Sequence, residues 1–257
     1  MSEQQGVCAI CGKVRVLTEE HVPPKCAYNR HSILLKHINR DETVSRGEVR
    51  WRTTASRDGR YIVGLCRKCN SRTGSWYGTD YAEFAKAGAE SSIPSGERGY
   101  LVFSGRPAAV AKEGLVCLCT TSGPGVAEGC KELRRLILSN HYRGRPGHLR
   151  LWIYLRATVG GHQTGVAGGI DTAVGETRVV SEFSHWPLGW VISWDDQAIA
   201  ELCEVTHWLE MEYKRRTTVT VNVPRLWKPT AYPLDYRTPE QFDRDRRETP
   251  DDGVSHS

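Results

Sequence analysis

Two Cys-x-x-Cys pairs are the part of this 257-residue chain best suited to chemistry. Cys8 and Cys11 form the first pair and Cys66 and Cys69 the second, with 54 residues between them. Each pair can turn two thiolates to one side of a tight knuckle, and two knuckles complete the tetrahedral four-sulfur shell that zinc prefers. The chain holds nine cysteines and shows no secretory signal, which favours reduced thiols over a disulfide framework. We therefore expect a structural zinc site at these four cysteines.

A Glu-His pair and an asparagine accompany the cysteines. Glu20 and His21 follow a short predicted strand at Val14–Leu17, and Asn70 comes directly after the second cysteine pair. Hydrolysis of a phosphodiester needs a base that takes a proton from the attacking water, and a cation that neutralises the charge developing on the phosphate. A histidine can be neutral at physiological pH and act as that base. Carboxylate and amide oxygens suit a hard cation such as Mg²⁺.

The order of these residues resembles the HNH, or His-Me finger (ββα-metal), endonucleases. It is most similar to the zinc-bound branch that includes phage recombination endonuclease VII and bacterial proteins with Glu-His-x-x-Pro and Leu-Cys-x-x-Cys-Asn signatures. The resemblance covers roughly residues 7–88 and rests on Glu20, His21, Pro24, Leu65, Cys66, Cys69 and Asn70.

The resemblance implies a role for each matching residue. His21 is expected to be the general base, and Glu20 and Asn70 are expected to bind a catalytic Mg²⁺ or Mn²⁺ ion. The third histidine of the family name is missing, so a carboxylate of the helix after Asn70 is expected to complete the cation site. Asp80 and Glu83 are the candidates, and we favour Asp80. The function implied is metal-dependent hydrolysis of nucleic acid, with DNA favoured over RNA.

Two other interpretations stay open. A zinc ribbon that binds nucleic acid or a protein without cutting would carry the same cysteines, with Glu20 and His21 in an ordinary surface turn. Alternatively, the protein is a toxin or defence effector whose nuclease is held inactive by the second half of the chain.

Basic residues are concentrated in the first third of the chain. Residues 1–90 hold 15 Lys and Arg against 10 Asp and Glu, so the whole net charge of +5 lies there. A dense basic cluster suits a phosphate backbone, because each neutralised phosphate releases counterions. The alternative is that these arginines merely solvate the edge of a hairpin. The residues expected to contact nucleic acid are Arg50, Arg52, Arg57, Arg60, Arg67, Lys68 and Arg72.

The elements expected to position this site are short. We expect a helix over Ala27–Asn39, then a hairpin of strands Glu48–Thr54 and Arg60–Leu65, because Asp58-Gly59 is a strong turn signal. The hairpin would deliver Cys66 at its far end. A helix over Tyr77–Ala89 follows, with one apolar face.

The second segment carries a different pattern. Residues 149–156 alternate apolar and other side chains, which is typical of a strand in a sheet. Helices are expected near 107–119 and 130–139, and strands are expected at 100–103, 149–156, 163–170, 177–183, 190–194 and 217–223.

The predicted fold class is therefore α+β, with a zinc-stabilised ββα-metal finger domain followed by an α+β domain with an antiparallel sheet. We expect the finger in residues 1–90, the second domain in 97–235 and a charged disordered tail in 236–257, where aromatic and aliphatic residues nearly vanish. No apolar run is long enough to cross a membrane, so we expect a cytoplasmic protein with no membrane partner. The second domain is also a candidate for forming a homo-oligomer.

Overall fold

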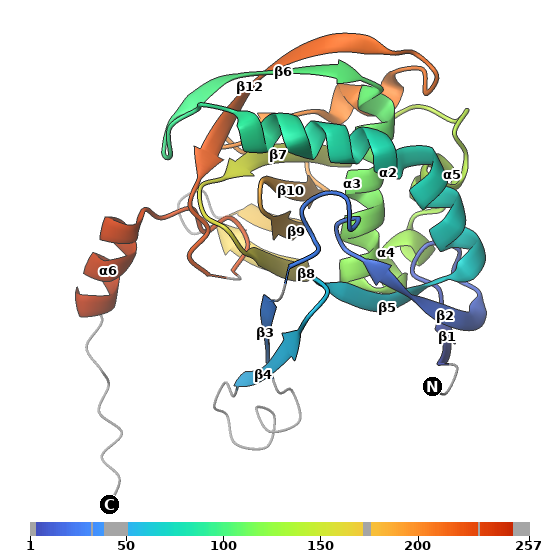
Figure 1. Cartoon of the computed structure of the whole chain (residues 1–257), viewed down its shortest axis with the longest axis horizontal. Helices are drawn as coiled ribbons and strands as arrows, with labels where there is room; N and C mark the ends of the chain where they lie inside the picture. The colour runs from blue at the N-terminus through green and yellow to red at the C-terminus, as the bar shows by residue number, and fades with distance from the viewer. Residues whose placement is uncertain (1–3, 32, 39–50, 172–175, 231, 249–257) are drawn as a thin grey trace, which may run out of the picture.

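The computed structural model describes residues 4–31, 33–38, 51–171, 176–230 and 232–248. It is a mixed α and β structure with two small sheets near the N-terminus and one large sheet behind the helices (Figure 1). This agrees with the predicted α+β class and its antiparallel sheets. In the large sheet, one short pairing, between Arg225–Leu226 and Leu155–Arg156, is parallel.

The first small sheet brings the two cysteine pairs together. Its strands run in the order β1, β2, β5, and both pairings are antiparallel. A 24-residue helix, α2, begins where β5 ends and packs on both β2 and β5. The predicted helix is thus confirmed and starts ten residues earlier, at Arg67. The bounds are β1 Gln5–Val7, β2 Val14–His21, β5 Tyr61–Cys66 and α2 Arg67–Glu90.

The segment between β2 and β5 differs from the prediction. The apolar run expected in a helix over Ala27–Asn39 is instead strand β3 (Ile33–Ile38), which pairs with β4 (Trp51–Ser56) and projects from the body (Figure 1). Four neighbouring apolar residues are too few to show a helical period, and pairing with β4 satisfies their backbone as a strand.

The predicted hairpin of Glu48–Thr54 with Arg60–Leu65 is also wrong. Residues 48–50 lie outside the described residues, and β4 pairs with β3 while β5 pairs with β2. The turn at Gly59, where φ is +78°, leads from one sheet to the other. Asn29 binds the start of β5, because its side chain hydrogen bonds to both the N–H and the carbonyl of Arg60.

The large sheet has seven strands, six of them in the order β6, β12, β7, β10, β9, β8, and β11 pairs with β7. Its central strand β7 is buried on both faces: Leu151, Ile153 and Leu155 belong to the main core, whereas Trp152 and Tyr154 belong to a smaller one. The bounds are β6 Arg98–Gly105, β7 Arg150–Arg156, β8 Gly161–Asp171, β9 Glu176–His185, β10 Leu188–Ser193, β11 Cys203–Glu204 and β12 Thr217–Leu226.

Helices cover the face that carries the main core. The predicted helices near 107–119 and 130–139 are confirmed, and α2 packs directly on α3. Tyr81 of α2 stacks on Trp190 of β10, and Phe84 contacts Trp208. Residues from both predicted domains therefore share one hydrophobic core. The bounds are α3 Pro107–Ser122, α4 Pro124–Gly129, α5 Lys131–Leu138 and the 3₁₀ helix η1 Thr206–Glu210.

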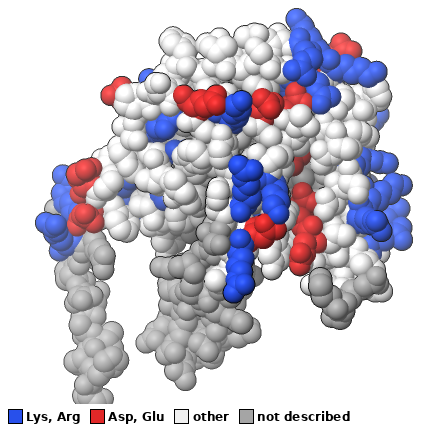
Figure 2. Space-filling model, viewed as in Figure 1, with Lys and Arg blue, Asp and Glu red and all other residues white. Residues whose placement is uncertain are grey.

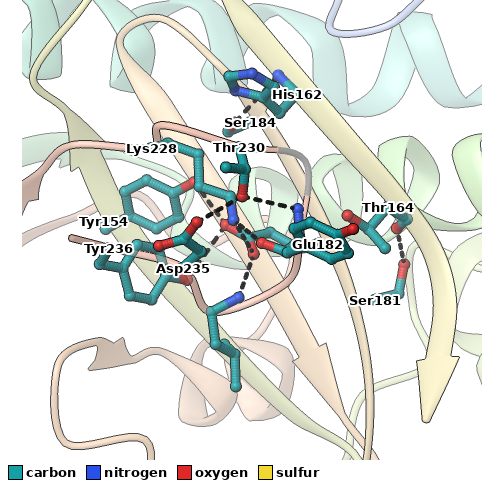
Figure 3. A network of polar contacts seen from close by, with 12 residues as sticks. Tyr154, His162, Thr164, Ser181, Glu182, Ser184, Lys228, Thr230, Asp235 and Tyr236 are labelled. Carbon is teal, nitrogen blue, oxygen red and sulfur yellow. Dashed lines mark hydrogen bonds and ion pairs between the residues drawn. The ribbon is translucent and has the colours of Figure 1, made fainter. Parts of the chain in front are cut away.

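A buried polar network attaches the segment after β12 to the other face of the sheet (Figure 3). Glu182 accepts hydrogen bonds from the hydroxyls of Tyr154 and Tyr236, at 2.7 and 3.2 Å, and from the backbone N–H of Leu234. Its charged partner is Lys228, whose ammonium lies 3.2 Å from the carboxylate, and both side chains are almost fully buried. Because Glu182 has a counter-charge and several donors, this network is satisfied within the chain.

The predicted disordered tail begins as a helix. Residues 239–248 form α6 (Pro239–Glu248), and residues 249–257 lie outside the described residues. The Thr238 hydroxyl accepts from the N–H of Gln241, and the Gln241 side chain accepts from the N–H of Thr238. This reciprocal capping box is a local signal that outweighs the polar composition on which the tail prediction depended.

Candidate metal centre and active site

The four cysteines of the two pairs converge at one point. The sulfur atoms of Cys8, Cys11, Cys66 and Cys69 all lie within 4.8 Å of one another. The Cys11 and Cys66 sulfurs are 4.0 Å apart, close to the separation of about 3.8 Å that a tetrahedron with Zn–S bonds of about 2.3 Å requires. The cluster is mostly buried. Four thiols in this arrangement can bind a structural metal such as zinc.

Local backbone geometry forms the first knuckle. The N–H of Gly12 donates to the carbonyl of Cys8 at 2.9 Å, and Gly12 adopts a φ of +68°, which suits glycine. The Cys69 thiol and the backbone N–H of Cys66 donate to the Cys8 sulfur and lower the pKa of Cys8 to about 4, although burial opposes this change. This favours the thiolate of Cys8, which is the form that binds metal, whereas burial raises the pKa of Cys11 and the hydrogen bond to Cys8 raises the pKa of Cys69.

Glu20 and Asn70 meet between β2 and the first turn of α2. Glu20 is 9% exposed, and burial raises its pKa to about 7 while the Asn70 side chain lowers it. The Asn70 amide Nδ2 also donates to Thr18 Oγ1 at 3.1 Å and to the carbonyl of Glu19 at 3.3 Å. These bonds use the N–H groups of Asn70, and its Oδ1 atom takes no part in them. The structure thus brings two of the predicted site residues together.

His21 lies on the opposite face of β2 from Glu20, since neighbouring residues of a strand alternate. Its Nε2 atom is 2.9 Å from the backbone carbonyl of Asp58 and 3.8 Å from the Asp58 carboxylate, which in turn pairs with Lys25. A carbonyl only accepts hydrogen bonds, so Nε2 carries a proton, and in the neutral form of the ring Nδ1 is the unprotonated nitrogen. The side chain is 27% exposed, which keeps it accessible to water.

Asp80 is held elsewhere. Its carboxylate accepts from the backbone N–H of Arg106 at 2.9 Å and from the Arg106 guanidinium at 2.8 and 2.5 Å. It lies ten positions beyond Asn70 in the helix, a distance of about 15 Å along the axis. The structure therefore does not bring Asp80 to Glu20 and Asn70.

A second buried carboxylate is Glu113 of α3. Glu113 is 1% exposed, and burial together with the charge of Glu20 raises the pKa of Glu113 well above its usual range. The sequence analysis missed this residue. The available signal was a charged pair, Lys112-Glu113, inside a helix whose residues from Pro107 to Thr120 are otherwise mostly apolar and are all buried.

The predicted nucleic-acid contacts are dispersed. Arg50 lies outside the described residues, and the Arg52 side chain belongs to a part of β4 whose side chains are not described. Arg60 is 6% exposed, so its guanidinium is turned inward and is not presented to a ligand on the surface. Basic side chains form separate groups on the visible face (Figure 2). Arg57, Arg67 and Lys68 are exposed, and Arg72 lies over the ring of Trp76.

Comparisons with protein-family models, curated proteins and solved structures found no match for this chain. Among the helices of the described residues, none combines the length and apolar character needed to span a membrane.

Proposed function

We propose that this protein is a metal-dependent endonuclease that hydrolyses phosphodiester bonds of nucleic acid, with DNA as the favoured substrate. The observation that carries the proposal is the meeting of Glu20 with Asn70. The next residue, His21, lies on the opposite face of β2, and a backbone carbonyl sets its tautomer. The resemblance of these residues to the His-Me finger endonucleases supports the same activity. The order of β2, β5 and α2 is compatible with it.

The oxygen donors fit a hard divalent cation. Glu20 would supply a carboxylate and Asn70 its Oδ1 atom, and both are ligand types that Mg²⁺ and Mn²⁺ accept. Such an ion, when bound, neutralises charge that develops on the phosphate and the leaving oxygen. The four cysteines would hold a separate zinc ion, since thiolates suit zinc and oxygen ligands suit magnesium.

His21 is suited to general-base catalysis. With its proton held on Nε2 by the Asp58 carbonyl, the unprotonated Nδ1 can accept a proton from water. The ion pair between Asp58 and Lys25, at 2.7 Å, fixes the loop that supplies this carbonyl. Asp58 is therefore a positioning residue, which acts through the orientation of the His21 ring. The exposed Arg67 and Lys68 at the start of α2 would contact the phosphate backbone.

A cleavage assay on the whole, zinc-loaded protein tests the proposal. Supercoiled plasmid and structured RNA are incubated with Mg²⁺ or Mn²⁺ and either the wild type or His21→Ala. We expect the wild type to cut and His21→Ala to lose about 100-fold or more of the rate, as for loss of a general base. His148→Ala is the matched control, because His148 is 72% exposed and pairs with Asp196 away from this site.

Equal cutting by the wild type and His21→Ala would contradict the proposal. Salt-sensitive binding of nucleic acid by both proteins, with no cutting in either metal, would instead favour the non-catalytic zinc-ribbon adaptor.

A further inference from the structure

A group of cationic side chains lies where α2, α5 and the loop after α5 meet. α2 packs on α5, and the Tyr77 hydroxyl of α2 donates to the carbonyl of Ile137 in α5 at 2.8 Å. Figure 2 shows Lys and Arg side chains gathered on the side of the molecule where α2 begins in Figure 1. We call this group the α2–α5 basic surface, and its members are Arg72, Lys131, Arg135, Arg143 and Lys214.

Direct contacts join the α2 part of this surface to the loop after α5. Arg72 lies over the ring of Trp76, with its Cζ atom 5.3 Å from the ring centre. The Trp76 carbonyl accepts a hydrogen bond from the Tyr213 hydroxyl at 2.8 Å. Tyr213 and Lys214 line a hollow of about 360 Å³ together with Arg143 of the loop. The basic surface therefore continues from α2 across this hollow.

The α5 part joins the same surface through Tyr142. The Arg135 guanidinium lies over the Tyr142 ring, with its Cζ atom 4.4 Å from the ring centre. The buried Lys112 ammonium fixes this segment by donating to the Tyr142 carbonyl at 2.8 Å. Arg143 follows Tyr142 directly, and Lys131 lies one turn before Arg135 on the same side of α5. The cations are thus held in place by ordered neighbours.

Few acidic residues accompany these cations. Residues 67–76 and 131–145 together hold eight Lys and Arg and one acidic residue, Glu132. The hollow adds a second acidic residue, Glu212. None of the five cations of the surface forms an ion pair within the described part of the chain. Neighbouring positive charges repel one another, so a bound polyanion would stabilise this arrangement.

Two features of the surface favour nucleic acid over an anionic membrane. Aromatic rings lie among the cations, and a nucleic acid offers both phosphates for the guanidinium groups and bases that stack on such rings. A protein surface that binds a membrane also needs exposed apolar side chains. The exposed large hydrophobic residues of the described ranges all belong to other parts of the chain.

The α2–α5 basic surface is separate from the proposed cation site. Arg72 follows Asn70 by two positions, and two residues turn a helix by about 200°, so the two side chains leave α2 on nearly opposite sides. We propose that this surface is a second, non-catalytic binding site that holds the phosphate backbone of DNA away from the point of cleavage. The choice of DNA rests on the proposed function, whereas an adaptor without activity would use the same contacts.

Binding of a fluorescent DNA duplex to the zinc-loaded full chain, without Mg²⁺ or Mn²⁺ and over a range of NaCl concentrations, tests the proposal. The test variant replaces three exposed cations of the surface: Arg135→Gln, Arg143→Gln and Lys214→Gln. The control variant removes the same charge from exposed residues of the last turns of α2 and of α6: Lys86→Gln, Arg244→Gln and Arg247→Gln. Both variants should melt like the wild type, because all six side chains are exposed.

We expect the test variant to bind DNA at least about tenfold more weakly than the wild type at the same salt concentration. The slope of the logarithm of the binding constant against the logarithm of salt concentration should decrease in magnitude by about three, since each lost phosphate contact removes about one. The control variant should keep the slope of the wild type.

Equal affinity and slope for the test and control variants would overturn the proposal. Structured RNA and phosphatidylserine vesicles are measured in parallel. A loss confined to RNA would overturn the choice of DNA, and a loss confined to the vesicles would identify a membrane-binding surface instead.

The outcomes also separate this inference from the proposed function. If the wild type cuts nucleic acid but the test variant binds DNA like the control, the inference fails and the proposed function stands. If the wild type does not cut and only the test variant loses DNA binding, the second binding site stands without the nuclease.

Discussion

Glu20 and Asn70 are fifty residues apart in the chain, yet their side chains meet between the end of β2 and the first turn of α2. The antiparallel pairing of β2 with β5 causes this, because β5 leads directly into α2. Thr18 strengthens the junction by donating to the carbonyl of Leu65 and accepting from Asn70. The same junction carries two of the four cysteines, so metal binding at the cysteines and the position of Asn70 are physically linked.

Loss of one cysteine of the cluster should therefore destabilise the N-terminal sheet. We expect Cys66→Ser to release bound zinc and to lower the free energy of unfolding by several kcal/mol, about the scale at which metal binding contributes to folding. Zinc content and urea unfolding measure both effects. Cys203→Ser is the control, since Cys203 lies in β11, outside the cluster. An unchanged unfolding curve for zinc-free protein would count against a structural metal.

The buried Glu20 should make stability depend on pH. Its pKa rises from the usual 4.5 to about 7 in the folded protein, so the folded state binds the proton more tightly across that window. Stability should therefore fall as the pH rises from 4.5 to 7, by about 3 kcal/mol in total. Glu20→Gln should remove most of this fall.

Urea unfolding of zinc-loaded wild type and Glu20→Gln at about pH 5 and about pH 8, without added Mg²⁺ or Mn²⁺, checks the sign. The variant should match the wild type more closely at the lower pH and exceed it at the higher pH. The opposite order would mean that Glu20 is stabilised as an anion.

Asp80 should prove structural. Asp80→Asn leaves the half-buried Arg106 guanidinium without its carboxylate, and breaking such a buried pair costs about 3 kcal/mol. Binding of Mn²⁺ per folded molecule should not change. The double variant Asp80→Asn with Arg106→Gln should lose less than the sum of the single losses, because the two side chains act as one unit. Loss of Mn²⁺ binding at full stability would restore Asp80 as a ligand.

His185 should contribute to acid lability. Burial and the charges of Arg60 and Arg156 lower the pKa of His185 from 6.5 to about 4, although a hydrogen bond to the carbonyl of Trp186 opposes them. As the pH falls, the unfolded chain takes up the His185 proton before the folded chain does. The stability that neutral His185 contributes is therefore fully present above pH 6.5 and is lost as the pH falls toward 4, by up to about 3 kcal/mol. His185→Asn should flatten this loss, measured by urea unfolding, while the exposed His148→Asn should not.

Local patterns in the sequence predicted the features that depend on neighbouring residues. Cys-x-x-Cys spacing indicated the four-cysteine cluster, and alternation in residues 149–156 indicated β7, because knuckles and strand faces depend on short spacings. The capping box at Thr238 was equally local, but the polar composition of the tail hid it.

Only the tertiary structure decided which elements became partners. Asp58-Gly59 predicted a hairpin from local turn chemistry, yet β5 pairs with β2. This pairing joins residues from forty positions apart (His21 with Tyr61) to forty-nine (Leu17 with Cys66). Asp80 and Glu113 are both buried helical carboxylates, and their sequence spacing does not distinguish them. Arg106 pairs with the first, whereas the second lies in α3, which packs against β5, and its Oε2 atom makes no hydrogen bond among the described residues. Such choices follow from burial of surfaces distant in sequence, which no local periodicity records.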